Sequence, residues 1–209
     1  MTEWFAKAET FFMDFDGVIK ESVRVKSDAF EQLFSMFGTE ISKKVRNHHE
    51  ANGGMSRFDK LPIYLDWSGQ PSTQRFVNKY SENFSFLVKQ KVIDSEWVPG
   101  ILDFLNYNSS RQFFLITATP QKEIEEIINQ LNLLPLFKKI IGSPIKKTNA
   151  VKILLEEYSI SIDKVIMIGD SSCDFEAAKV NQIPFILRKT NYNIKLQQKL
   201  DCPMINNFL

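Results

Sequence analysis

Two acidic residues with one residue between them follow an apolar run near the start of the chain. Asp14 and Asp16 come directly after Phe11–Met13, and Gly17 follows at once. The apolar run predicts a buried parallel strand, and glycine permits a tight turn after it. Open α/β sheets bind ligands at the carboxyl ends of their strands, so we expect both carboxylates to face one ligand. One would be a nucleophile or metal ligand and the other an acid or base, although an ordinary capped turn also explains the pattern.

A second predicted strand, Gln112–Ile116, ends in hydroxyl residues. Thr117, Ala118 and Thr119 follow it, and Pro120 comes next. A hydroxyl at a strand end, followed by free backbone N–H groups that enter a helix, can hold a phosphate. We expect Thr119 to be the N-cap of this helix and Pro120 its first residue. The alternative is that Thr119 is only a helix cap and Thr117 only a β-forming residue, without a role in phosphate binding.

The pair Lys146–Lys147 precedes a predicted helix at 149–158. A lysine directed at a phosphate would neutralise the charge that develops during phosphoryl transfer. A solvated basic surface shared with nearby lysines is the alternative. We choose Lys147 as the phosphate-facing residue, because Thr148 and Asn149 after it can cap the helix; Lys146 remains the other candidate.

An apolar strand at 164–168 leads to two further acidic residues, Asp170 and Asp174. Mg²⁺ prefers oxygen ligands and keeps several waters, so a few carboxylates and a substrate phosphate suffice to bind it. Asp14 and Asp170 would supply these carboxylates from the ends of adjoining strands. Cys173 lies beside acids that would raise the pKa of its thiol, and we expect it to be a packing residue.

The elements that would position these residues fall into two kinds. Strand and helix patterns alternate from residue 98 onward, which is typical of a parallel, doubly wound α/β sheet. Residues 21–95 instead show helical periodicity and no strand signal, and a crossover between parallel strands needs far fewer residues. We therefore predict an α/β core domain made of residues 1–20 and 96–209, with an inserted helical cap subdomain at 21–95.

The predicted cap contains a polar stretch with two glycines at residues 47–60. The glycines would let this stretch close over a site, and Arg57 or Lys60 could reach a second anionic or polyhydroxyl group of a substrate. His49 is a third candidate for a role in substrate specificity. Helix capping or solvation is the alternative explanation for His49 and Arg57.

The composition limits the partners and the location of the protein. Its 209 residues are 44% apolar and include 18 phenylalanines, as in a globular protein with an aromatic core. Lysine and arginine number 26 against 25 acidic residues, so no electrostatic footprint for nucleic acid or an anionic membrane is expected. No apolar run is long enough to span a membrane, and residues 1–9 lack a signal-peptide pattern. Two cysteines without metal or disulfide spacing favour a cytoplasmic location, and we expect a monomer or weak dimer.

Together, these motifs resemble those of the haloacid dehalogenase superfamily, and the resemblance covers essentially the whole chain. They are Asp14-Phe15-Asp16-Gly17-Val18, the Thr117 strand, a lysine before a helix, and Gly169-Asp170 followed by Asp174. The inserted cap is similar to the helical C1 cap of the branch that contains phosphoglycolate phosphatases and β-phosphoglucomutases. The resemblance implies a Rossmann-like core and a Mg²⁺-dependent phosphatase that acts on a small phosphorylated metabolite. The third motif departs from the Gly-Lys-Pro pattern of this branch.

The resemblance also implies how the acids would act. Asp14 would attack phosphorus and form an aspartyl-phosphate. Asp16 would protonate the leaving oxygen and then activate the hydrolytic water. Mg²⁺ would be bound by Asp14, Asp170 and the backbone carbonyl of Asp16.

Four further residues would support this reaction. Thr117, the Ala118 N–H and Lys147 would hold the phosphoryl oxygens. Asp174 would bind the waters of the metal or orient the lysine. Such an arrangement suits phosphoryl transfer, which depends mostly on positioning and on neutralising the equatorial oxygens.

Asp16 also bears on the alternatives. Dehalogenases need no acid at this position, and the phosphonatase branch has an Asp-x-Ala pattern with alanine where this chain has Asp16. Both branches are therefore disfavoured. A phosphomutase of the β-phosphoglucomutase type is the main alternative, since it uses the same two acids. A non-catalytic phosphate-binding protein is less favoured, because none of the expected acids is missing.

Overall fold

The computed structural model describes residue 5 and residues 7–209. Two predictions extend beyond these residues: the lack of a signal peptide in residues 1–9, and the first part of the predicted core segment 1–20. Within the described part of the chain, no helix is both long and apolar enough to cross a membrane.

Among the described residues, six parallel strands form one sheet in the order β3-β2-β1-β4-β5-β6. The central strand β1 is mostly phenylalanine and is buried along its whole length. The strands are β1 Thr10–Met13, β2 Gln112–Pro120, β3 Lys139–Ser143, β4 Val165–Gly169, β5 Phe185–Arg188 and β6 Met204–Ile205.

Helices cover both faces of this sheet, because alternate residues of a strand point to opposite sides. Phe11 and Met13 of β1 pack in one hydrophobic cluster with helices α6 and α7. Phe12 packs in a second cluster with α8 and α9. The predicted doubly wound α/β sheet is therefore confirmed. The helices that accompany the sheet are α6 Ile101–Tyr107, α7 Gln121–Gln130, α8 Lys147–Glu157, α9 Ser172–Val180 and α10 Ile194–Lys199. A short 3₁₀ turn, η2, lies at Leu134–Leu136.

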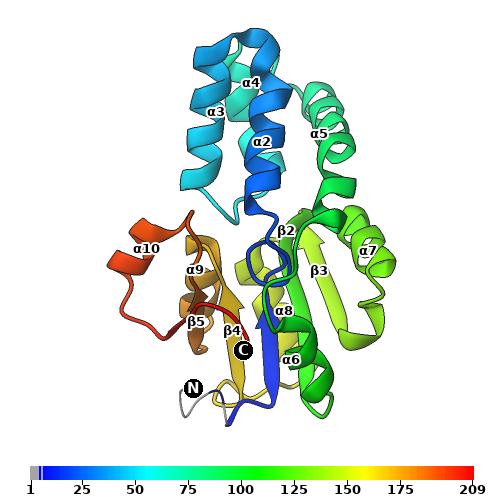
Figure 1. Cartoon of the computed structure of the whole chain (residues 1–209), viewed down its shortest axis with the longest axis vertical. Helices are drawn as coiled ribbons and strands as arrows, with labels where there is room; N and C mark the ends of the chain where they lie inside the picture. Colours follow the sequence, from blue (N-terminus) through cyan, green and yellow to red (C-terminus); the bar gives the residue numbers. More distant parts are fainter. Residues whose placement is uncertain (1–4, 6) are drawn as a thin grey trace.

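Between β1 and α6, where every residue is described, the chain forms four α-helices and contributes no strand to the sheet. Figure 1 shows them as a separate group above the sheet, and we call this group the helical insertion. Its interior is aromatic: the ring centroids of Phe30 and Phe84 lie 3.9 Å apart, and Tyr64 meets Phe30 edge-on. The helices are α2 Val23–Phe34, α3 Thr39–Ala51, α4 Arg57–Trp67 and α5 Gln74–Asp94, and a 3₁₀ turn, η1, follows α2 at Ser35–Phe37.

The predicted start of α7 is wrong. Strand β2 continues to Pro120, which pairs with Ser143 of β3, and α7 begins at Gln121. Thr119 is therefore a strand residue, and its hydroxyl accepts a hydrogen bond from Lys26 at 2.8 Å and does not cap the helix.

The predicted start of α8 is also wrong. The helix begins at Lys147, because the carbonyl of Lys146 already accepts a bond from the Ala150 N–H at 2.9 Å. Lys146 occupies the N-cap position, so Thr148 and Asn149 lie within the first turn.

Candidate active site

The turn after β1 places the first acid against the end of β4. The Asp14 N–H donates to the carbonyl of Ile168 at 3.0 Å, which continues the strand pairing into the turn. Gly17 has a φ of +72°, and a Cβ there would lie 2.3 Å from Oδ2 of Asp170. Only glycine allows both this left-handed turn and the close approach of Asp170. The Asp-x-Asp-Gly pattern thus brings the acids of two strands together.

Three buried carboxylates meet at this edge of the sheet. One oxygen each from Asp14, Asp170 and Asp174 lies within 4.8 Å of the others. Lys147 Nζ is 2.6 Å from Asp14 Oδ2 and 2.7 Å from Asp174 Oδ1, whereas Lys146 is exposed. Of the two lysines proposed from the sequence, the structure brings Lys147 to the acids.

The charges of this cluster do not balance. Burial, together with repulsion from Asp174, raises the pKa of Asp14 to about 7. Burial and the charges of Asp14 and Asp174 raise the pKa of Asp170 well above its usual range. Burial would lower the pKa of Lys147, but the two acids beside it raise its pKa instead. Three acids thus share one lysine, and their oxygens are the donors that Mg²⁺ prefers, so the residues present fit a divalent cation.

Asp174 acts on the lysine through a fixed geometry. Its Oδ2 accepts hydrogen bonds from the N–H and the hydroxyl of Ser171, which closes a capping box at the start of α9. Its Oδ1 is thereby left to accept from Lys147. A Cβ at Gly169 would lie 2.2 Å from the Cβ of Asp174, so the strand end needs glycine to admit this side chain. Of the two roles expected for Asp174, these contacts support orientation of the lysine.

Asp16 lies apart from the cluster in a different environment. Its Oδ1 accepts a hydrogen bond from the Ser22 hydroxyl at 2.6 Å, and its Oδ2 lies 2.5 Å from Lys26 Nζ. Burial alone would raise the pKa of Asp16, but Lys26 and Ser22 outweigh it and lower this pKa. The pKa values of Asp14 and Asp16 are thus shifted in opposite directions, because Asp14 lies near other acids whereas Asp16 is paired with Lys26.

The end of β2 supplies the remaining predicted residues. Ala118 and Thr119 line a cavity in front of Asp14. Thr117 is buried, and its hydroxyl accepts from the Thr119 N–H at 3.2 Å.

The same cavity is bounded on its far side by the helical insertion. Its volume is about 70 Å³, well below the roughly 300–1,000 Å³ of pockets for drug-sized ligands. His49, Arg57 and Lys60, the three candidates for substrate specificity, all line it together with Asp14 and Asp16. The structure therefore brings predicted residues of both parts of the chain to one small cavity, although Thr117 and Asp174 are not among the residues that line it.

These three residues differ in their partners. Arg57 forms a bidentate ion pair with Glu123 of α7, with N–O distances of 2.9 and 2.6 Å, and both side chains are buried. Arg57 also donates to the Ser85 hydroxyl of α5 at 2.7 Å. Lys60 instead lies 2.9 Å from Nδ1 of His49.

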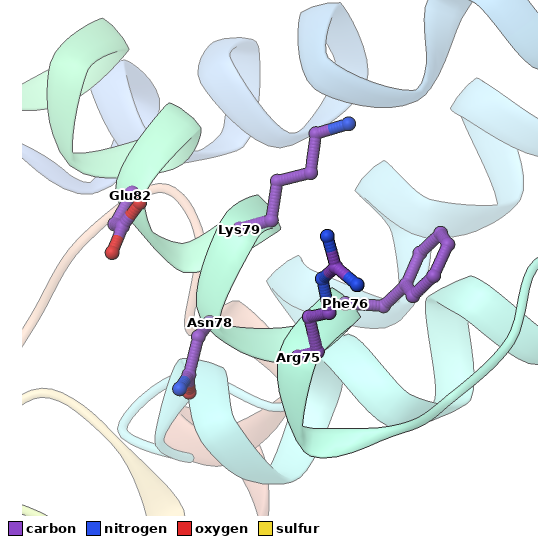
Figure 2. Close-up of a pocket in the computed structure, with 5 residues that line it drawn as sticks. All are labelled: Arg75, Phe76, Asn78, Lys79 and Glu82. Carbon is purple, nitrogen blue, oxygen red and sulfur yellow. The ribbon is translucent and has the colours of Figure 1, made fainter.

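A larger hollow of about 730 Å³ lies on the outer side of α5. Figure 2 shows that the five residues lining it all come from this helix: Arg75, Phe76, Asn78, Lys79 and Glu82. No second element of the described chain contributes a side chain, so we interpret it as the solvated face of a helix.

Sequence analysis missed Lys26 and Glu123. Lys26 lies one turn into α2 and bridges Asp16 and Thr119. Glu123 lies in the first turn of α7 and pairs with Arg57, 66 residues away. An acidic residue in a first turn usually indicates only a favourable interaction with the helix dipole, so Glu123 carried no distinguishing signal. Lys26 carried none either.

Comparison with known proteins agrees with this geometry. A model of the haloacid dehalogenase-like hydrolase family matches residues 11–187. The chain is 34% identical over 182 residues to a phosphoglycolate phosphatase of Vibrio parahaemolyticus, and the matched region covers 79% of this chain and 77% of that protein. It is 25% identical over 183 residues to a phosphorylated carbohydrates phosphatase of Thermotoga maritima, with coverages of 82% and 80%. Its fold resembles that of CbbY from Rhodobacter sphaeroides, solved with phosphate, at a TM-score of 0.75, 15% identity and coverages of 96% and 95%.

Proposed function

The chain belongs to the haloacid dehalogenase-like hydrolases, and on this premise we propose that it is a Mg²⁺-dependent phosphatase which cleaves a small phosphate ester through an aspartyl-phosphate. Its curated relatives are named as phosphatases of phosphoglycolate and of phosphorylated carbohydrates. The observation that carries the proposal is the Lys147 bridge between Asp14 and Asp174 beside Asp170, facing a small cavity.

Asp14 is the nucleophile. One of its carboxylate oxygens bonds to phosphorus while the bond from phosphorus to the ester oxygen breaks. The Phe15 N–H donates to Asp14 Oδ1 at 2.7 Å and Lys147 lies at Oδ2, so the carboxylate is held in one orientation before attack. Lys147 also offsets the charge of the phosphoryl oxygens, which would otherwise repel an anionic nucleophile.

Asp16 moves the protons. Because Lys26 favours the ionised form of Asp16, Asp16 first takes up a proton from solvent and then gives it to the departing ester oxygen in the first half of the reaction. In the second half it takes a proton from the water that attacks phosphorus, and the Asp14 carboxylate is released with inorganic phosphate. Lys26 positions Asp16 through its contact with Oδ2, and it favours the ionised form that the second half requires.

Thr117 and the Ala118 N–H hold phosphoryl oxygens at the end of β2. Asp14, Asp170 and the backbone carbonyl of Asp16 would hold the metal ion. When bound, Mg²⁺ would supply positive charge to the acid cluster and to the phosphoryl group, so that the ester can approach Asp14.

The helical insertion, at residues 21–95, acts as a cap over the core at 1–20 and 96–209. The cavity of about 70 Å³ leaves no room for bulk water beside a substrate. A substrate therefore enters while the cap is open and reacts while it is closed.

Phosphate release from a panel of small esters tests the proposal. Turnover should require Mg²⁺, and excess chelator should abolish it. An Asp170→Asn variant should lose the rise in melting temperature that Mg²⁺ gives the wild type, a readout independent of activity. A hexose 1-phosphate with a bisphosphate primer tests the mutase alternative, because isomerised product formed faster than free phosphate would overturn the hydrolase assignment.

A further inference from the structure

Lys60 is a buried cation in the cavity without an acidic partner. Its side chain is 1% exposed, and its hydrogen-bond partner is Nδ1 of His49. No carboxylate of the described residues lies within ion-pair distance of it. The other cations lining the cavity each pair with an acid, as Lys26 does with Asp16 and Arg57 with Glu123.

The surroundings of Lys60 disfavour its charge. Burial lowers its pKa to about 7. Cys173 and Asp16 act to raise this pKa, while Lys26 and Lys147 act to lower it.

His49 responds to the same surroundings. Burial and the neighbouring Lys60 hold its pKa well below the usual range, so the ring is neutral and Nδ1 can accept a hydrogen bond from the ammonium group. The ring packs against Phe30 at a centroid distance of 4.7 Å, which fixes its position. A buried ammonium group held by a neutral ring is destabilising unless an anion joins it.

We propose that Lys60 and His49 form a subsite for a carboxylate carried by the substrate, so that the enzyme selects small phosphorylated carboxylic acids over uncharged phosphorylated carbohydrates. The subsite rests on the proposed phosphatase function. It lies on the cap side of the cavity that contains Asp14, so one short molecule can place its phosphate at Asp14 and its carboxylate at Lys60.

The chemistry of the pair favours a carboxylate over a second phosphate. One ammonium group with a neutral imidazole matches a single negative charge, whereas a second phosphate ester carries about two. Arginine is the usual partner for bidentate phosphate recognition, and Arg57 is already held by both oxygens of Glu123.

A matched pair of esters tests the subsite: phosphoglycolate and its uncharged amide. We expect the wild type to prefer the acid by about tenfold or more in kcat/KM, since a hydrogen bond to a charged group contributes about 1.5–3 kcal/mol. Lys60→Met should reduce kcat/KM for the acid about tenfold more than for the amide, mainly through KM. Lys79→Met, an exposed lysine of the same insertion, should leave both values unchanged.

Two results would overturn the subsite. One is a wild-type enzyme that hydrolyses both esters equally well, which needs no variant. The other is an equal loss on both esters in Lys60→Met. Failure of the proposed function itself is distinguishable, because no ester, including an aryl phosphate, would then release phosphate with Mg²⁺.

Discussion

The two walls of the cavity differ in how their charges are balanced. On the wall made by strand ends, Lys147 lies between Asp14 and Asp174 within 2.7 Å of each, and these three side chains are buried. This wall is assembled before any substrate arrives. Under the proposed function, a phosphate and a cation complete it.

The wall made by the helical insertion is balanced differently. Arg57 finds its acid in the core, at Glu123, and this contact exists only while the two walls are together. Lys60 has a neutral partner, His49, and its charge is left for a ligand to balance. Under the proposed function, the strand ends perform the reaction and the insertion selects the substrate.

The largest expected effect comes from the wall made by strand ends. Asp14→Asn replaces a nucleophilic carboxylate with an amide, and we expect kcat to fall on the order of 10⁴-fold or more, as when other enzymes lose their nucleophile. Phosphate release from an aryl phosphate measures this, with near-ultraviolet circular dichroism as the control for folding. An Asp14→Asn enzyme within tenfold of the wild type would remove the distinction between the two walls.

A smaller effect is expected for Lys26, which extends from the insertion to Asp16. Lys26→Met should lower kcat about 10- to 100-fold on every ester while KM changes little, because Asp16 loses its positioning contact. Lys26→Arg keeps the charge and should recover part of the loss. A loss confined to KM would instead place Lys26 in substrate binding.

The ion pair between the walls should affect closure. Glu123→Gln leaves Arg57 buried without an acid, which costs roughly 3–5 kcal/mol for a buried pair, and opening of the insertion relieves part of this. We therefore expect KM to rise about tenfold on all esters. Glu126→Gln is the matched control, because Glu126 of the same helix α7 pairs with Lys89 of α5 in an exposed setting. Equal effects of the two variants would show that the buried pair does not govern closure.

The smallest expected effect concerns pH. The pKa of Lys60 lies at about 7, so its charge is present below pH 7 and is lost as the pH rises. The KM for a phosphorylated acid should therefore rise by up to about tenfold from pH 6 to pH 8, relative to the KM for the matching amide. In Lys60→Met this difference between the esters should not depend on pH. A pH-dependent difference that persists in the variant would assign the titration to another group.

The wall made by strand ends could be predicted from the sequence because local patterns fix it. Asp14 and Asp170 each follow an apolar strand, and parallel strands place their carboxyl ends on one edge. Gly17 indicated the turn that brings them together. Lys147 was chosen for the wrong reason, since the helix begins at Lys147 itself.

The contacts between the walls could not be predicted in this way. Lys26 meets Thr119 from 93 residues away, and the hydroxyl that was expected to cap α7 is bound by this lysine. Arg57 indicated a substrate contact, but its partner is Glu123 on a helix of the core. Such pairings depend on how the insertion packs against the sheet, which no local periodicity encodes.

The position of β1 in the middle of the sheet has a consequence for synthesis of the chain. Thr10 pairs with Gln112 on one side and with Val165 on the other, so the strand that carries Asp14 gains both neighbours only after most of the protein has left the ribosome. Until then, the phenylalanines of β1 have no sheet to enter, and unpaired apolar edges of this kind attract chaperones and other nascent chains. Truncations that remove β4 should therefore aggregate even when the helical insertion is intact.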